Sequence, residues 1–412
     1  MLRSFVSRAL IQPVQAFVAL EASSGLVLLA ATAVALVWAN SPWSTQYTEL
    51  WARHFSFEFA RIAVHMDLEH VVNDGLMAVF FFVVGLEIKR ELLRGELASP
   101  RKAMLPVAAA LGGMVVPALI FSAWNFGGPG AHGWGIPMAT DIAFALGVLA
   151  LMGRRAPFSL KVFLLALAIV DDLGAILVIA MFYTDHIVLA AAAWAIVLAA
   201  AIIVLLLVGF RSKAVYLILA VLFWLAVYKS GIHATIAGVV LAALTPAGPR
   251  ADADGAEGDD ATGRDSPLDR LEELLHPWVG YLIVPVFALA NAGLALSSGL
   301  VHDASTSHIT LGIAFGLVVG KPVGVVLFSW LAVRFGGAKL PDGMAAHQLI
   351  GGGLLAGIGF TVSLFVTGLA FGDVQLTNDA KAGVFAASLI SGVAGCAWIL
   401  LAPRIWRQSE PG

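Results

Sequence analysis

The sequence predicts an all-α, polytopic membrane protein, and three observations support this prediction. Hydrophobic residues make up 60% of the chain and charged residues 12%, against about 45–50% and about 25% in soluble proteins. Long uncharged segments recur from end to end, and about 20 apolar residues are enough for a helix to cross a bilayer. Lysine and arginine also gather in alternate loops, as the positive-inside rule expects of a chain that crosses a membrane repeatedly.

Twelve apolar segments are interpreted as membrane spans. The second is weakened by Asp74 and Glu87, and the seventh and eighth are short. The basic N-terminus and the first segment together resemble a signal peptide. However, the run from Leu26 to Trp38 is long and more spans follow, which favours an uncleaved first span. The approximate spans are 22–40, 70–89, 103–126, 135–153, 158–183, 186–210, 214–228, 230–246, 277–297, 308–333, 347–371 and 382–403.

The distribution of basic residues predicts the orientation. With the N-terminus in the cytoplasm, 19 of the 24 lysines and arginines face the cytoplasm, four face outside and Lys321 lies within a span. This asymmetry places both termini in the cytoplasm. The predicted organisation is a cytoplasmic N-terminal segment (1–21), spans one to eight (22–246) with an external hairpin near 43–66, a cytoplasmic linker (247–275), spans nine to twelve (276–405) and a cytoplasmic tail (406–412).

Two loops have distinctive compositions. Residues 247–267 are rich in Gly, Ala and Asp with almost nothing to bury, which predicts a flexible linker. Aromatic and polar residues alternate in Phe55–Phe59, FSFEF, and this period-2 pattern predicts a short strand that pairs through Arg61–His65. A solvated loop is the alternative. The net charge of −3 excludes a nucleic-acid partner, which requires a basic surface, and the single cysteine, Cys396, excludes an internal disulfide.

The most informative feature is a pair of adjacent aspartates, Asp171 and Asp172, at the middle of the apolar run Val162–Thr184. A carboxylate there costs about 2.5–3.5 kcal/mol on insertion scales, so the pair needs water, a cation or a proton. Neighbouring helical residues point about 100° apart, so one carboxylate can line an aqueous cavity while the other turns toward another helix. The two are expected to titrate as a coupled unit. Such a pair can hold protons or a small hard cation, and competition between these occupants is the basis of proton/cation exchange.

Asp141 is the only charged residue of its span and follows a segment rich in Gly and Pro, residues 127–137. This composition predicts a helix break near Thr140. A broken backbone is tolerated inside a membrane only where it is buried or lines a cavity. An acid beside the N-terminal end of the following half-helix would offset its partial positive charge.

A second irregular span lies near the C-terminus, where Gly351–Gly353 precede Gly357–Thr361 without any charged residue. Paired Gly-interrupted spans in corresponding halves indicate a transporter with inverted repeats and a binding site at the membrane midplane. The alternative is that these glycines only allow close helix packing.

Lys321 is the sole charge of its span. It requires a carboxylate partner or the carbonyl end of a broken helix, and the deep carboxylates are Asp141, Asp171 and Asp172. Snorkelling of the side chain to the surface is the alternative, but Lys321 lies about midway along the span. Among the other ionisable groups, His233 can titrate near neutral pH, although a structural histidine is as well supported. On composition alone, solvated helix-end charge is favoured for Glu87, Glu91, Glu272, Glu273 and His276.

Seven segments together resemble the NhaA-type sodium/proton antiporter family. The similarity extends over about residues 20–405, and its motifs are specific in combination. The segments are Asn73–Glu91, Ala139–Leu151, Ala166–Gly174, Lys229–Gly238, His276–Trp278, Gly320–Gly324 and Gly357–Thr361.

The resemblance implies twelve helices in a bacterial inner membrane, with inverted repeats and with spans four and eleven broken and crossing at mid-membrane. It implies that Asp172 is the principal carboxylate for Na+ and protons, and that its neighbour Asp171 shares the cation and pairs with Lys321. Thr140 and Asp141 would lie at the crossing, where Asp141 and Lys321 balance opposite helix-end charges.

The resemblance further implies electrogenic export of Na+ or Li+, with more than one H+ entering per cation, activated at alkaline pH and serving pH homeostasis and salt tolerance. No cofactor and no organic substrate are expected, and a homodimer would form through the external hairpin, within membrane lipid. Glu87, Glu91, Glu272 and His276 become candidate pH-sensing positions. Beside Glu272 the family carries a histidine where this chain has Glu273, and a carboxylate titrates about two units below imidazole, so a different activation pH is expected.

Three other functions were weighed. A sodium-coupled symporter is the nearest, but it requires a substrate pocket for which few embedded polar residues remain. A cation channel requires neither a proton-titrating pair nor Lys321. An intramembrane aspartyl protease requires aspartates on two helices, for which Asp141 and Asp172 are available, but neither has a Gly-x-Gly-Asp context.

Overall fold

The computed structural model describes residues 23–59, 62–184, 186–210, 212–248, 266–296, 306–341 and 343–407. Apart from one β-hairpin, the regular structure of these residues is helical. Seven helices are long and apolar enough to cross a membrane, and ten spans result if each bent helix pair counts as one. The prediction of an all-helical polytopic membrane protein is therefore confirmed. The expected flexible linker falls mostly on residues 249–265, which lie outside the described residues, as does the N-terminal segment.

The long spans include several with internal π-helical turns. The first is Leu68–Arg94, made of α3 (Leu68–His70), η1 (Val71–Leu76) and α4 (Met77–Arg94). Two more spans are composite. Pro267–Asn291 consists of α11 (Pro267–Trp278), η5 (Val279–Ile283) and α12 (Val284–Asn291), and His308–Phe335 consists of α14 (His308–Phe315), η6 (Gly316–Gly320) and α15 (Lys321–Phe335). The remaining long spans are the single helices α5 (Pro100–Trp124), α7 (Phe158–Phe182), α8 (Leu189–Leu207) and α18 (Val374–Arg407).

Three helix pairs are bent at a short break. The 3-10 helix η3 (Ala131–Met138) and α6 (Ile142–Leu151) meet at 41°, and α16 (Ala346–Ala356) and α17 (Phe360–Ala370) meet at 43°. These are spans four and eleven, so the predicted breaks are confirmed in both. The third bend was not predicted: α2 (Ser44–Trp51) leaves the helix Ser23–Ala39 at 116°.

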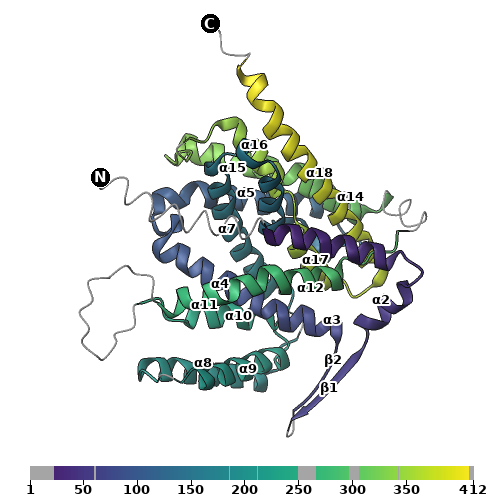
Figure 1. Cartoon of the computed structure of the whole chain (residues 1–412), viewed down its shortest axis with the longest axis vertical. Coiled ribbons are helices and arrows are strands. Elements are labelled where there is room, and N and C mark those ends of the chain that lie inside the picture. The colour runs from purple at the N-terminus through teal and green to yellow at the C-terminus, as the bar shows by residue number, and fades with distance from the viewer. Residues whose placement is uncertain are drawn as a thin grey trace.

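Two shorter helices coincide with the predicted seventh and eighth spans, α9 (Lys213–Lys229) and α10 (Thr235–Leu244). With 17 and 10 residues they are shorter than a helix needs to cross a bilayer. Length and composition therefore support ten spans, and the expected count of twelve depends on α9 and α10. Figure 1 shows α8 and α9 side by side at one edge of the molecule. Leu189 and Leu207 of α8 are largely exposed, as expected of side chains that face lipid.

The loop between α2 and α3 contains the predicted strands. β1 (His54–Phe59) and β2 (Ile62–Asp67) pair antiparallel, with Phe57 opposite Val64. The hairpin projects from the helical body (Figure 1). The alternative of a solvated loop is therefore wrong, and the alternation of aromatic and polar residues was the correct signal.

The helices α5 and α15 pack at backbone distance where two glycines face each other. A Cβ atom built on Gly112 would collide with the carbonyl oxygen of Gly324, and one built on Gly324 would collide with that of Gly112. Because α15 begins with Lys321, this contact also fixes the helix that carries the buried lysine. Glycine at these two positions therefore allows the two helices to pack closely.

We expect Gly112→Ala to lower the free energy of unfolding by about 1–3 kcal/mol, because the added methyl overpacks a closed interface. Gly368→Ala is the matched control: it lies within α17 with nothing within 4 Å of an added Cβ, and alanine is the better helix former. Thermal unfolding of the purified protein in detergent measures both. Equal melting temperatures for Gly112→Ala and wild type would contradict this account.

Candidate functional site

The breaks in the two bent spans contact each other. The backbone N–H of Asp141 donates to the carbonyl oxygen of Ile358 at 2.7 Å, and the hydroxyl of Thr140 donates to the carbonyl oxygen of Ala356 at 2.9 Å. Each break therefore satisfies polar backbone groups of the other, which a non-helical segment requires at membrane depth. Thr140 and Asp141 are almost fully buried at this contact.

Asp141 accepts hydrogen bonds from the N-terminal ends of two half-helices. Its Oδ1 accepts from the Phe144 N–H of α6 at 2.9 Å. Its Oδ2 accepts from the N–H and the hydroxyl of Thr361, at the start of α17, at 3.0 and 2.6 Å. Each helix N-terminus carries a partial positive charge of about half a unit. The carboxylate of Asp141 is thereby compensated by backbone dipoles and by the hydroxyl of Thr361.

Lys321 is fully buried and has two acceptors. Its Nζ forms an ion pair with Oδ2 of Asp171 at 2.6 Å, and Asp171 is also fully buried. The same Nζ donates to the carbonyl oxygen of Met138, at the C-terminal end of η3. The sequence offered three carboxylates or the end of a broken helix as partners for Lys321. The structure shows that Lys321 contacts one carboxylate, that of Asp171, and one helix end, that of η3. Because the residue is buried, snorkelling does not describe it.

Asp172 points in another direction and lines a cavity. The cavity has a volume of about 50 Å³ and is also lined by Thr140, Asp141 and Thr361. Glu87 of α4 and His276 of α11 contribute to its wall. The adjacent aspartates thus face different environments, as the rotation of about 100° per helical residue requires.

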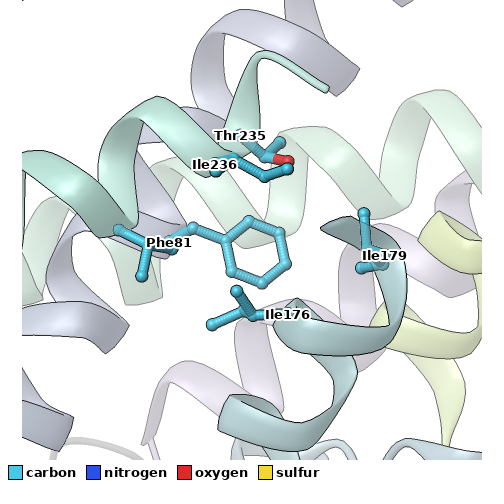
Figure 2. Close-up of a pocket in the computed structure, with 6 residues that line it drawn as sticks. Phe81, Ile176, Ile179, Thr235 and Ile236 are labelled. Carbon is cyan, nitrogen blue, oxygen red and sulfur yellow. The ribbon is translucent and has the colours of Figure 1, made fainter. Parts of the chain in front are cut away.

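A second, apolar pocket, with no room for a water molecule, lies on the other side of Asp172 along α7. Figure 2 shows Phe81 of α4 between Ile176 and Ile179 of α7 and Thr235 and Ile236 of α10. Ile176 is one helical turn beyond Asp172, and Thr235 is the only polar residue among those that line the cavity. Apolar cavities of this kind stay dry. The carboxylate is therefore reached through the first cavity and sealed on this side by apolar side chains.

The candidate pH-sensing residues divide into separate groups. Arg90 forms ion pairs with Glu272 and, at 3.6 Å, with Glu91, so these residues of α4 and α11 lie together. Glu273, the next residue of α11, is exposed. His233 lies elsewhere, where its Nε2 donates to the carbonyl oxygen of Tyr183 at the end of α7. The structure therefore brings Glu91 and Glu272 together around Arg90, and places Glu87 and His276 on the cavity wall. Glu273 and His233 belong to neither group.

Sequence reasoning missed several residues at this site. Charged residues of α4 and α11 form a group that we call the α4–α11 charge cluster: Arg90, Glu91, Arg94, Asp269 and Glu272. Of these, Arg90, Arg94 and Asp269 were missed, and Arg94 contacts Asp269 at 3.0 Å. Helical spacing was an available signal, since Arg90 and Arg94 are four residues apart and therefore share one face. Thr361 had no assigned role either, although a hydroxyl residue at the start of a half-helix is a common cap.

The site suits a transient hard cation. Carboxylate, hydroxyl and carbonyl oxygens converge around Asp171, Asp172 and Thr140, and such oxygens are the ligands of hard cations. Within the described ranges, no group of three or more His, Cys, Asp or Glu side chains is arranged to hold a resident metal ion.

Two broken helices whose breaks meet beside buried carboxylates and a lysine define the class of secondary transporters with a site between half-helices. Comparisons with known proteins identify the family. Residues 15–399 match the model of the family described as Na+/H+ antiporter 1. The chain therefore belongs to this family.

Curated relatives resemble the chain over nearly all of its length. The Na(+)/H(+) antiporter NhaA of Rhodopirellula baltica is 46% identical over 97% of this chain and 95% of its own. The proteins of the same name from Salmonella arizonae and from an Escherichia coli strain are 48% and 47% identical, over 93% of this chain and 97% and 96% of their own.

We expect Lys321→Ala and Asp171→Ala each to destabilise the protein by about 3–5 kcal/mol, because each leaves an unpaired buried charge. The double variant should lose less than the sum, since no charge is left without its partner. A double-mutant cycle from unfolding in detergent measures this coupling. Additive losses would contradict a direct ion pair.

Proposed function

We propose that this protein exchanges Na+ for H+ across the membrane by alternating access, with Li+ as a second cation. Asp172 is the principal carboxylate for both ions, and Asp171 and Thr140 complete the site. The observation that carries the proposal is the position of Asp172 on the cavity wall beside the Lys321–Asp171 ion pair. The names of the relatives support exchange, which makes the protein a transporter and not an enzyme.

We propose electrogenic exchange, with more than one H+ entering per Na+, because the family resemblance implies it. In the structure Asp141 accepts hydrogen bonds from two helix ends, and Asp171 pairs with Lys321. The proposed exchange therefore centres on Asp172. Because protons and Na+ compete for the same oxygens, cation binding strengthens as the pH rises.

We propose twelve spans for the membrane architecture, with α9 and α10 as the seventh and eighth, although each is short. The pairing of two broken spans supports inverted repeats with a crossing at mid-membrane. Both termini and the linker 247–275 are assigned to the cytoplasm of a bacterial inner membrane by the positive-inside rule. The cavity that Glu87 and His276 line then opens to the cytoplasm.

The α4–α11 charge cluster lies next to this entrance and is the proposed site of pH sensing. Glu87, Glu91, Glu272 and His276 are within or next to it. Glu273, which is exposed, would act only through its charge, and His233 belongs to a different region. Titration of these groups changes the ion pairs between α4 and α11, and α4 also lines the ion cavity through Val83 and Val84.

The geometry disfavours the other functions. An aspartyl protease needs two carboxylates facing one bond, but both oxygens of Asp141 accept hydrogen bonds from helix N-termini. A channel needs a continuous path, and the apolar side chains around Phe81 interrupt it. A symporter for an organic molecule needs polar groups to bind its substrate. The polar groups at the helix breaks already form hydrogen bonds with one another.

We expect Asp172→Asn to abolish Na+-driven exchange. Everted membrane vesicles from an antiporter-deficient host, acidified inside by respiration, report exchange through a pH-sensitive dye. Na+ should alkalinise the lumen of wild-type vesicles more at about pH 8.5 than at about pH 7, because the proposed site binds Na+ and protons in competition and the family resemblance implies activation at alkaline pH.

The control for Asp172→Asn is Asp373→Asn, an exposed aspartate whose Oδ1 accepts from the backbone at the start of α18. Asparagine can keep this cap, so its exchange should match wild type. If wild type, present in the membrane, responds to neither Na+ nor Li+, the antiporter proposal is wrong and the symporter becomes the better one.

We propose that the protein forms a homodimer through the β-hairpin. A two-stranded sheet leaves unpaired backbone groups on both edges, which can pair with a second copy. Replacing residues 55–66 by a short Gly-Ser linker should convert the dimer to a monomer in mild detergent, with exchange activity retained. Light scattering measures the mass of the protein. A dimer that persists after this deletion would place the interface elsewhere.

A further inference from the structure

The half-helix η3 has little stability of its own, although it ends next to Lys321. It is an eight-residue 3-10 helix that contains Gly133, Gly135 and Pro137, and 3-10 helices of this length are uncommon because their hydrogen bonds are poor. Yet its C-terminal end delivers the Met138 carbonyl oxygen to Lys321. Contacts from other elements must therefore hold η3 in place.

Tyr183 supplies two of these contacts. Its buried hydroxyl donates to the carbonyl oxygen of His132 at 3.0 Å and accepts from the N–H of Gly135 at 3.2 Å. Its ring also packs edge-on against the ring of His132, with the centroids 5.1 Å apart. A Cβ on residue 135 would lie 2.7 Å from the phenol oxygen, so glycine is required there. One side chain thus fixes η3 at two points within one helical turn.

The position of Tyr183 in the chain connects this contact to the ion site. Tyr183 ends α7, the helix that carries Asp171 and Asp172, about three turns beyond them. Through Tyr183, α7 therefore holds both the carboxylates and the half-helix whose end binds Lys321. The hydroxyl of Ser363 donates to the Ile136 carbonyl oxygen at 2.8 Å and holds η3 from α17.

We propose that Tyr183 is a positioning residue for ion exchange: it holds η3 in register with α7, so that the Met138 carbonyl oxygen can retain the Lys321 ammonium group while Na+ occupies the carboxylates. This inference rests on the proposed antiport. The carbonyl contact matters because Na+ and Lys321 are both cations at Asp171, and the lysine needs another acceptor when Na+ binds there.

The contact persists across the working pH range. Burial raises the pKa of the Tyr183 phenol to about 12, although the Gly135 N–H acts to lower it. The phenol therefore remains protonated and continues to donate to His132. Loss of the hydroxyl would leave a backbone N–H and a carbonyl without this partner and free η3 to shift. Lys321 would then remain on Asp171 and oppose Na+ more strongly.

The test uses full-length protein in proteoliposomes with an imposed pH gradient, and compares wild type with Tyr183→Phe. We expect the KM for Na+ to rise at least about fivefold, with the maximal rate within about twofold of wild type, because a buried hydrogen-bonded hydroxyl is lost but the carboxylates remain. A purely structural defect would lower the maximal rate by reducing the active fraction and leave KM unchanged.

Tyr216→Phe is the matched control, because it loses a phenol–carbonyl hydrogen bond of 3.0 Å to Phe210 near the start of α9, away from the ion site. Its KM should equal that of wild type. An unchanged KM in Tyr183→Phe, or an equal rise in both variants, overturns the inference. Wild-type protein without Na+-driven exchange instead overturns the proposed function.

Hydrogen exchange of the wild-type protein tests the inference independently if Tyr183→Phe fails to fold. The Gly135 N–H is predicted to exchange slowly, and more slowly with saturating Na+, because cation binding requires η3 to retain Lys321. Exchange of the peptide 131–138 as fast as that of an unstructured peptide, or unaffected by Na+, would show that η3 is not held in this way.

Discussion

The structure depends on one constraint: every charge placed inside the membrane must be balanced there. Asp171 and Lys321 form an ion pair, and Asp141 is held by the N-termini of α6 and α17. The helix breaks serve this purpose, because an unbroken helix has no free ends at membrane depth to offer. Asp172 lines the cavity together with Asp141, and it is the carboxylate that we propose for the exchangeable ion.

Compensation by rigid elements also determines how the site can work. Lys321 contacts both the Asp171 carboxylate and the Met138 carbonyl oxygen, so it can lose the first contact and keep the second. In the proposed mechanism Na+ and protons occupy the same oxygens in turn, and the apolar side chains around Phe81 close one side of the site. Tyr183, Ser363 and the close contact of Gly112 with Gly324 hold the elements that carry these groups.

Much of this arrangement was predictable from the sequence, because a charged residue within an apolar run is a strong signal. Asp141, Asp171, Asp172 and Lys321 stood out in this way, whereas both broken spans were predicted from glycine and proline within apolar runs. The partner of Lys321 was not determined by composition or spacing, since several deep carboxylates were available and the choice depends on how α7 and α15 pack. Tyr183 was missed because a tyrosine at the end of an apolar helix is ordinary, and its two contacts with η3 arise only in the folded chain. The short α9 and α10 are the elements whose length does not support the predicted spans.

Proton release on cation binding tests the central claim most directly, because it needs no membrane and no transport. Na+ would be added to purified protein in weakly buffered detergent solution, and the protons released would be counted with a pH indicator. This account predicts that Na+ displaces protons from wild type, more than one per cation at a pH where the site starts protonated, and displaces far fewer from Asp172→Asn. Saturable Na+ binding without proton release would show that the two ions do not share these carboxylates, and would contradict the account.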